Sequence, residues 1–274
     1  MAMNELVFAP LGGVGEIGMN FALYGYGPPE RREWMIVDCG VTFPGPDLPG
    51  VDLVMPDIRY VTALGDAVKG IVITHAHEDH YGALNALWPM IRKPVWMTPF
   101  TAGLLESKSD MDGNAPKIPV KIFKAGDKFT VGPFSIETIH VAHSIPEPVS
   151  LLIRTPLGNV IHTADWKIDA EPTLGPDTDA AAFKRAGDEG VLALICDSTN
   201  ATRPGISPTE TAVSESLAEI IAEAPGRVAI TTFSSNVGRI RSIALAAKKA
   251  GRRVLLMGLS IRRVAEVSDS LGYF

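Results

Sequence analysis

The segment His75-Ala76-His77-Glu78-Asp79-His80 contains three of the chain's six histidines and two acidic residues. It follows an apolar run, Lys69–Thr74, that is typical of a buried β-strand and would place the segment in a loop at a sheet edge. Packing does not explain its three histidines and its aspartate, because each buried polar side chain would need a partner. The chain is therefore constrained to a fold in which a strand ends at a polar loop that can bind metal.

The spacing within this segment indicates two metal sites rather than one. Alternate residues of an extended chain point to the same side, so His75 and His77 can reach one ion. Asp79 and His80 lie beyond a bend and can turn toward a second ion nearby. Imidazole and carboxylate groups are common ligands of zinc.

Two further ligands are expected at other strand ends. His143 follows a predicted strand and could complete the ligand set of the first ion. Asp165 follows another predicted strand and could bridge both ions, as a carboxylate can. The histidines at 140 and 162 lie within a strand or before a loop, and we interpret them as structural.

Short β-type runs bounded by glycine and proline dominate the first 165 residues, with one short helix expected near residues 82–88. The predicted strands are residues 6–8, 21–24, 34–37, 69–74, 94–97, 120–123, 134–141, 149–154 and 159–163. This pattern favours two sheets packed face to face over a doubly wound parallel sheet.

From about residue 190 the pattern changes to alternating strands and helices. The segment Ser207-Pro208-Thr209-Glu210 is typical of a capping box and predicts a helix to about residue 224. A second helix is expected over residues 237–250, between strands at 227–232 and 253–257, after a strand at 191–196. This is a βαβ unit and predicts the beginning of a parallel sheet. A parallel sheet with so few strands would have a large uncovered edge. We therefore expect an incomplete second domain.

The segment Gly13-Val14-Gly15-Glu16-Ile17-Gly18 has the spacing of a dinucleotide-binding motif, with an acidic residue, Asp38, at a suitable distance. That mechanism needs a helix after the third glycine to hold the pyrophosphate. A strand-like run follows instead, so we predict a tight turn between two strands.

Composition is that of an ordinary globular protein, with 46% apolar and 20% charged residues and a formal net charge of −6. No apolar run approaches the roughly 18 residues of a membrane span, and no secretory signal is evident. Two cysteines, Cys39 and Cys196, cannot make a disulfide framework, which favours a reducing compartment. We therefore expect a cytoplasmic protein with no membrane partner.

Charge is distributed unevenly along the chain. Residues 1–226 carry 16 basic and 29 acidic side chains, whereas residues 227–274 carry 9 basic and 2 acidic ones. Taken alone, the basic segment is best interpreted as a solvated face of two helices.

The six candidate ligands resemble the metal-binding motifs of the metallo-β-lactamase fold. Asp38, which closes a predicted strand, fits the first acidic motif of that family. The segment Cys196-Asp197-Ser198-Thr199-Asn200 resembles motif A of the β-CASP nucleases. Together with the segments 11–20 and 142–146, the chain resembles the ribonuclease J family most closely, at five separated motifs over nearly its whole length.

This resemblance implies an α/β fold, with an αββα sandwich over residues 1–206 and the start of an inserted β-CASP domain over residues 207–274. It also implies two more histidine motifs beyond the insertion, which do not occur in these 274 residues. We therefore expect six ligands of the usual seven.

The resemblance further implies a zinc-dependent ribonuclease that hydrolyses RNA phosphodiester bonds, as exonuclease and endonuclease, in RNA and rRNA processing. Asp79 would orient the attacking hydroxide, and Asp38 and Asp197 would fix histidine rings. Two zinc ions are expected, with manganese or magnesium as other working ions. A structural calcium ion at Asp47 and Asp52 is implied by some relatives, although solvated turn carboxylates are the favoured interpretation.

RNA is the implied partner, with 5′-monophosphorylated ends preferred, and the full-length protein is expected to form homo-oligomers. Ser234, Ser235 and Asn236 precede a predicted helix and could hold the 5′-phosphate, or form a plain N-cap. Six basic residues of the C-terminal segment could contact the RNA backbone: Arg239, Arg241, Lys248, Lys249, Arg252 and Arg253.

Three other functions remain open at this stage. Another phosphodiesterase or thioester hydrolase of the same fold would share every ligand. A β-CASP nuclease acting on DNA would share the insertion as well. A catalytically incomplete RNA-binding fragment would keep RNA affinity without zinc.

Overall fold

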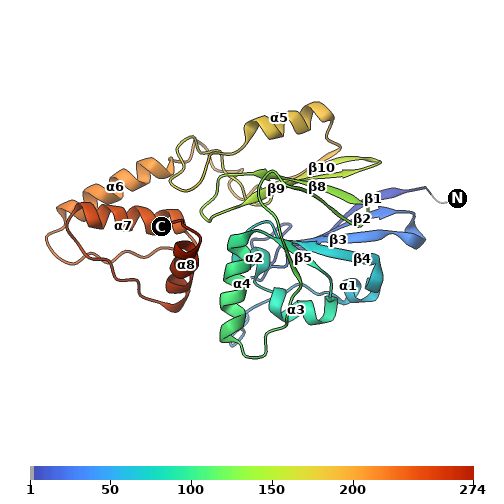
Figure 1. The fold of residues 1–274 in the computed structure, drawn as a ribbon, viewed down its shortest axis with the longest axis horizontal. Helices are drawn as coiled ribbons and strands as arrows, with labels where there is room; N and C mark the ends of the chain where they lie inside the picture. Colours follow the sequence, from blue (N-terminus) through green and yellow to red (C-terminus); the bar gives the residue numbers. More distant parts are fainter. Residues whose placement is uncertain (1–2) are drawn as a thin grey trace.

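Two β-sheets lie face to face in the computed structural model, which describes residues 3–274, and helices cover their outer faces (Figure 1). The first sheet has the order β1 (Glu5–Gly12), β2 (Phe21–Gly27), β3 (Glu33–Val37), β4 (Val68–Val72), β5 (Val95–Met97) and β6 (Val120–Ile122). The second has the order β11 (Ala193–Ile195), β10 (Gly158–His162), β9 (Val149–Thr155), β8 (Phe134–His140) and β7 (Lys128–Val131). The helices are α1 (Arg59–Leu64), α2 (Glu78–Tyr81), α3 (Leu84–Ile91), α4 (Pro99–Met111), α5 (Ala180–Glu189), α6 (Glu210–Glu223), α7 (Val237–Lys249) and α8 (Leu259–Ser270).

The two faces of the first sheet belong to different apolar clusters. Met35 of β3 lies in the cluster between the sheets, with Ile136 and Leu151 of the second sheet. Its neighbours Trp34 and Ile36 lie in the cluster on the side of α3 and α4. This alternation is the period of two expected of a strand. Because both faces are covered, strands such as β3 are apolar almost throughout.

Helix α5 covers the outer face of the second sheet. Ala182 and Ala186 of this helix form a third apolar cluster with Ile139, Leu152 and Ile161 of the strands below. With α1–α4 on the outer side of the first sheet, the layers are helix, sheet, sheet, helix (Figure 1). The predicted αββα fold class is thereby confirmed.

The glycine-rich segment forms the loop between β1 and β2, as predicted. Gly13 and Gly18 have positive φ angles of 82° and 91°, which L side chains rarely adopt. The antiparallel strand β2 follows directly and removes the helix that a dinucleotide site would need.

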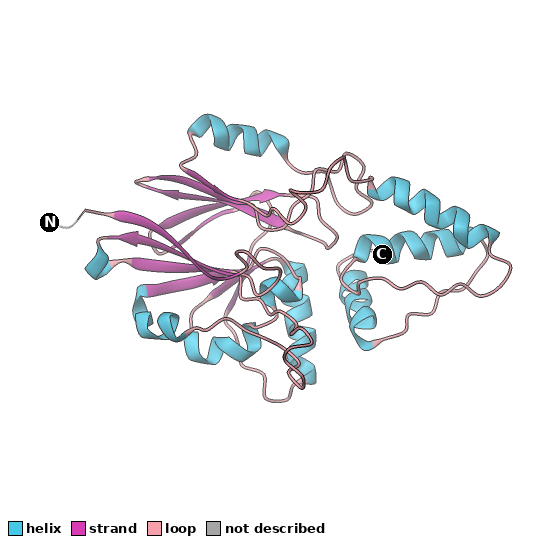
Figure 2. Cartoon of the chain, turned by 180° about the vertical axis from the view of Figure 1, so that it is seen from behind, coloured by secondary structure: helices cyan, strands magenta, loops and turns pink. Residues whose placement is uncertain are grey.

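Helices α6, α7 and α8 lie beside the sandwich, with α8 packed against α4 (Figure 2). The strands predicted at residues 227–232 and 253–257 are wrong, since neither segment joins a ladder. Two short strands alone would form a parallel pair with unpaired edges on both sides, which is marginally stable at best. Apolar side chains of these two segments are exposed, among them Leu255, which is 79% accessible.

The start of α6 also differs from the prediction. The helix begins at Glu210, and its N-cap is Thr209 rather than Ser207. Thr209 accepts a hydrogen bond from the Ala212 amide, while the Glu210 amide donates to the Asp169 carboxylate at 3.1 Å. Asp169 therefore supplies a cap from outside the helix, which local sequence does not indicate.

Of the helices in residues 3–274, none combines the length and apolarity needed to cross a membrane.

Candidate metal centre

Asp38 organises the floor of the site. It follows β3 in a left-handed conformation, with φ of 64°, and its amide donates to the Val72 carbonyl at the end of β4. The buried Asp38 carboxylate accepts hydrogen bonds from the Thr74 amide (2.8 Å) and hydroxyl (3.0 Å). It also lies 2.7 Å from Nδ1 of His80. That contact fixes the His80 ring and leaves its Nε2 directed into the site.

The first group of donor atoms is formed by His75, His77, His143 and Asp165. Nδ1 of His77 lies 3.1 Å from Nε2 of His75 and 3.0 Å from Nε2 of His143. Oδ2 of Asp165 lies 3.6 Å from Nε2 of His143. One ligand atom from each residue lies within 4.8 Å of all the others, a spacing that could hold a metal ion.

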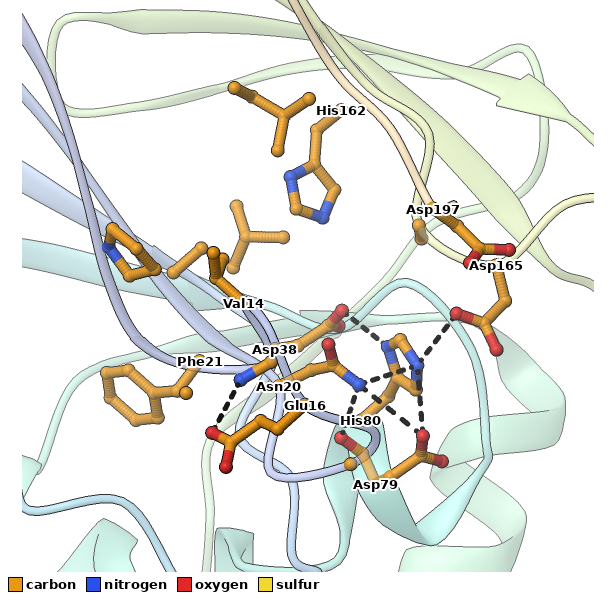
Figure 3. A pocket seen from close by; sticks show the side chains of 18 of the residues that line it. Val14, Glu16, Asn20, Phe21, Asp38, Asp79, His80, His162, Asp165 and Asp197 are labelled. Carbon is orange, nitrogen blue, oxygen red and sulfur yellow. Dashed lines mark hydrogen bonds and ion pairs between the residues drawn. The ribbon is translucent and has the colours of Figure 1, made fainter. Parts of the chain in front are cut away.

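The second group contains Asp79, His80 and, again, Asp165 (Figure 3). Nε2 of His80 lies 3.2 Å from Oδ1 of Asp165 and 3.6 Å from Oδ2 of Asp79. Asp165 thus directs one oxygen toward each group, as a bridging carboxylate would. The six side chains proposed from the sequence come from three strand ends, and the fold brings all six together.

Burial favours the neutral form of three histidines in the site. It lowers the pKa of His77 to about 3 and that of His143 to about 4, and neighbouring imidazoles add to the effect at His77. The pKa of His75 is also held well below its usual value by burial and by His80. A neutral imidazole is the form that binds metal. These three rings therefore do not have to lose a proton before they bind metal at neutral pH.

His80 has the opposite electrostatic environment. Burial opposes its charged form, but the carboxylates of Asp38 and Asp165 outweigh burial and hold the pKa of His80 well above its usual value. Burial likewise opposes ionisation of Asp165, but His80 and the other imidazoles lower the pKa of that carboxyl. Without an ion, a proton on His80 therefore compensates the acidic groups around it.

A cavity of about 460 Å³ opens beside the second group, within the usual size range of ligand pockets (Figure 3). The glycine-rich loop lines it, together with apolar side chains such as Phe8 and Ile195. The polar lining includes all three residues of the second group, Asp79, His80 and Asp165. The second group of donor atoms is therefore accessible from this cavity.

Asp197 lines the cavity, and the hydrogen bonds of its carboxylate lie within its own turn. Its carboxylate accepts hydrogen bonds from the amide (2.9 Å) and hydroxyl (2.7 Å) of Thr199, two residues later. Figure 3 places Asp197 beside Asp165 and draws no contact from it to a histidine ring. Both hydrogen bonds are accepted by Oδ1 of Asp197 and stabilise the local turn.

Two residues that the sequence analysis did not assign to the site also belong to it. Nδ2 of Asn20 lies 3.1 Å from the Asp79 carbonyl and 3.1 Å from Nε2 of His80. Thr74, two residues beyond the end of β4, holds Asp38. Asn20 ends the segment 11–20, and the family resemblance of that segment is the signal available for it.

The remaining predicted residues have mainly structural contacts. His140 Nε2 lies 3.0 Å from the Pro176 carbonyl, and Nδ1 of His162 lies 2.9 Å from the Tyr24 hydroxyl, which agrees with structural roles. Asn236 caps α7 by accepting from the Arg239 amide at 2.9 Å. Asn236 also lines a small cavity of about 80 Å³ that reaches His143.

Three of the six basic residues proposed for RNA are engaged within the chain. Arg239 pairs with Glu210 at 3.0 Å, and Arg241 donates to the Thr173 carbonyl. Arg252 donates to the carbonyls of residues 224 and 226. Lys248, Lys249 and Arg253 are exposed.

The profile of the Metallo-beta-lactamase superfamily matches residues 30–258, and the chain belongs to this family. Its donor set of imidazoles and carboxylates in two adjoining groups fits the metal site that the family name implies.

Proteins named ribonuclease J are among the relatives found by sequence. The chain is 64% identical over 98% of its length to "Ribonuclease J" of Sinorhizobium meliloti, covering 48% of that protein. It is 40% identical to "Ribonuclease J" of Thermus thermophilus, again over 98% of the chain and 48% of the relative. The chain thus spans about half the length of these curated relatives. A solved structure of a protein of unknown function from Enterococcus faecalis V583 has the same fold, with a TM-score of 0.69 and 18% identity over 97% of this chain and 68% of that one.

Proposed function

We propose that this chain forms the metal-binding part of a ribonuclease that hydrolyses RNA phosphodiester bonds with two zinc ions. The observation that carries the proposal is the pair of donor groups joined by the two oxygens of Asp165. Likeness to ribonuclease J proteins supports RNA as the substrate. Manganese or magnesium would be the other candidates for the working ion.

Zinc bound here would supply a hydroxide near neutral pH and polarise the phosphoryl oxygen of the substrate. His75, His77, His143 and Asp165 would hold one ion, and Asp79, His80 and Asp165 the other. Asp79 is about one-third exposed and borders the cavity, so its carboxylate can accept a hydrogen bond from the attacking water and orient it. Attack in line with the leaving group gives a 3′-hydroxyl and a 5′-phosphate.

Residues around the donor groups keep this arrangement in place. Asp38 holds the His80 ring through Nδ1, and Thr74 holds Asp38. Asn20 fixes the Asp79 backbone. Partners of this kind orient ligands and raise metal affinity.

RNA would enter from the side of α7. We propose that Ser234 and Ser235, just before this helix, contact a 5′-monophosphate, with Asn236 positioning the helix start. Lys248, Lys249 and Arg253 are exposed and free to contact the RNA backbone. Residues 207–274 would then be the start of a β-CASP domain after a sandwich over residues 1–206, in a cytoplasmic protein that forms homo-oligomers when full length.

Cleavage of a 5′-monophosphorylated RNA by the purified protein, beside a DNA strand of the same sequence, tests this function. Zinc-loaded protein should cleave the RNA, and His77→Ala should abolish the activity. His140→Ala is the matched control, because His140 lies outside both donor groups, and it should retain activity. Cleavage of DNA alone, or cleavage that survives His77→Ala, would contradict the proposal.

A further inference from the structure

The loop that carries His143 is constrained along its length. Ile145 and Pro146 are buried, and Ile145 belongs to the same apolar cluster as Val237 of α7. Glu147 has a left-handed backbone, with φ of 59°. A residue with a Cβ adopts this conformation at a cost of roughly 1 kcal/mol, so surrounding contacts must enforce it.

The Glu147 carboxylate supplies those contacts in two directions. Oε2 accepts a hydrogen bond from the Phe100 amide at 2.7 Å, in the first turn of α4. Negative charge at this end of a helix is favourable, and the amide otherwise lacks a partner within the helix. Oε1 accepts a hydrogen bond from the Tyr273 hydroxyl at 2.8 Å, just beyond α8. One side chain thus connects the His143 loop to α4 and to the segment after α8.

Packing between α4 and α8 supports the same connection. The rings of Phe100 and Tyr273 meet edge to face, with centroids 5.9 Å apart. A Cβ on Gly103 of α4 would lie 2.9 Å from a methyl group of Val267 of α8, so these helices approach closely there. The position of α8 on α4 therefore determines where the Tyr273 hydroxyl meets Glu147.

We propose that Glu147 and Tyr273 are positioning residues for His143, so that the seating of α8 against α4 sets the geometry of the first donor group. The proposal rests on the metal-binding role of His143 in the proposed function. His143 is four residues from Glu147. The short loop between them contains the buried side chains of Ile145 and Pro146. Loss of the Tyr273 contact would let this loop relax and move the His143 ring away from His77.

Cobalt(II), which gives visible absorption bands that depend on ligand geometry, is the probe. Purified wild-type protein, Tyr273→Phe, Glu147→Gln and His143→Ala are titrated with cobalt(II). Tyr273→Phe and Glu147→Gln should bind the ion about 10-fold more weakly, as when a ligand-orienting group is lost. Their spectra should shift toward that of His143→Ala. Ser270→Ala is the matched control, because it removes a hydroxyl near the end of α8 that bonds only within the helix, at 2.8 Å to the Val267 carbonyl.

Wild-type affinity and spectrum in Tyr273→Phe would overturn the proposal, even if thermal unfolding shows that the variant is less stable. If Glu147→Gln fails to fold, Tyr273→Phe decides alone, since it removes one hydroxyl from a half-buried side chain. RNA cleavage by the wild type is measured separately. Cobalt binding without cleavage would contradict the ribonuclease function but leave the positioning role standing, whereas absence of cobalt binding by the wild type would overturn both.

Discussion

At the scale of single residues, local spacing indicated the donor side chains at residues 75–80, and the family resemblance indicated Asp38 as a support for one of them. The four side chains at residues 75–80 follow from one strand end and alternate positions. Asn20 and Thr74 support them through contacts between segments distant in sequence, which no local pattern indicates. Asp197 accepts two hydrogen bonds from Thr199 of its own turn, and its role beside a histidine ring stays a prediction.

Asp38 gives the sharpest prediction at this scale. Asp38→Asn keeps the shape of the side chain but loses the charge that holds His80, so metal affinity and RNA cleavage should fall about 10- to 100-fold. Competition with a chelator measures the affinity. Asp188→Asn, on the exposed face of α5, is the control and should behave as wild type. Unchanged affinity in Asp38→Asn would show that the carboxylate does not support the site.

At the scale of elements, apolar runs predicted the strands of both sheets except β7, because strands buried on both faces read as continuous hydrophobic segments. Strand β7 has only one buried residue, Val131, and no apolar run marks it. Helices α4 and α5 were missed. Their N-caps are Thr98 and Asp179, and residues of these types are equally common in turns, so they do not by themselves indicate a helix. The strands at 227–232 and 253–257 were wrongly predicted because a run of β-type residues does not form a strand without neighbours to pair with.

Those two segments provide a prediction about hydrogen exchange. Because residues 227–232 and 253–257 form no ladder, their amides should exchange at nearly the rate of an unstructured chain. Amides of β4, at the centre of the first sheet, should be strongly protected. Exchange measured by mass spectrometry on the purified chain gives both values, and strong protection at 227–232 would contradict this part of the fold.

Glu137 of β8 provides a prediction about stability. Burial alone would raise the pKa of Glu137, but hydrogen bonds and charge from Arg154 and Arg185 outweigh burial and lower it. A lowered carboxyl pKa stabilises the fold above the unfolded pKa of about 4.3, and this contribution disappears as pH falls through the folded pKa. Glu137→Gln should therefore lose about 2 kcal/mol of unfolding free energy at pH 7, and less as the solution is acidified.

Urea unfolding at several pH values measures this difference. Glu30→Gln, at an exposed carboxylate, is the control and should leave stability unchanged. A stability difference at Glu137 that stays constant between pH 7 and pH 3 would contradict the ionic explanation.

At the scale of the whole molecule, a sandwich carries the donor groups and three helices lie beside it (Figure 2). One ion pair joins the two parts, between Lys167 and Glu210 at 3.5 Å. Lys167 also contacts Asp169 of its own part at 2.8 Å, and Glu210 also contacts Arg239 of its own part at 3.0 Å. The sequence shows the excess of positive charge in residues 227–274. It does not indicate which of these basic side chains form ion pairs or hydrogen bonds within the chain. Lys248, Lys249 and Arg253, which are exposed, are the ones expected to meet RNA.

Replacing Lys248, Lys249 and Arg253 with alanine should weaken RNA binding and reduce its dependence on salt. Each phosphate contact to single-stranded nucleic acid contributes about 0.7 to the slope of log affinity against log salt, so the slope should become shallower by about 2. Titrations at several salt concentrations give this slope. Lys184→Ala, on α5, is the control. An unchanged slope in the triple variant would place the RNA elsewhere.

The most direct measurement of the central claim is the metal content of the purified 274-residue chain by elemental mass spectrometry. We expect about two zinc ions per chain, because the donor groups joined by Asp165 provide two adjoining sites. The double variant His77→Ala, His80→Ala should bind neither ion, because it removes a donor from each group. Zinc content no higher in the wild type than in this variant would show that the donor groups do not bind zinc.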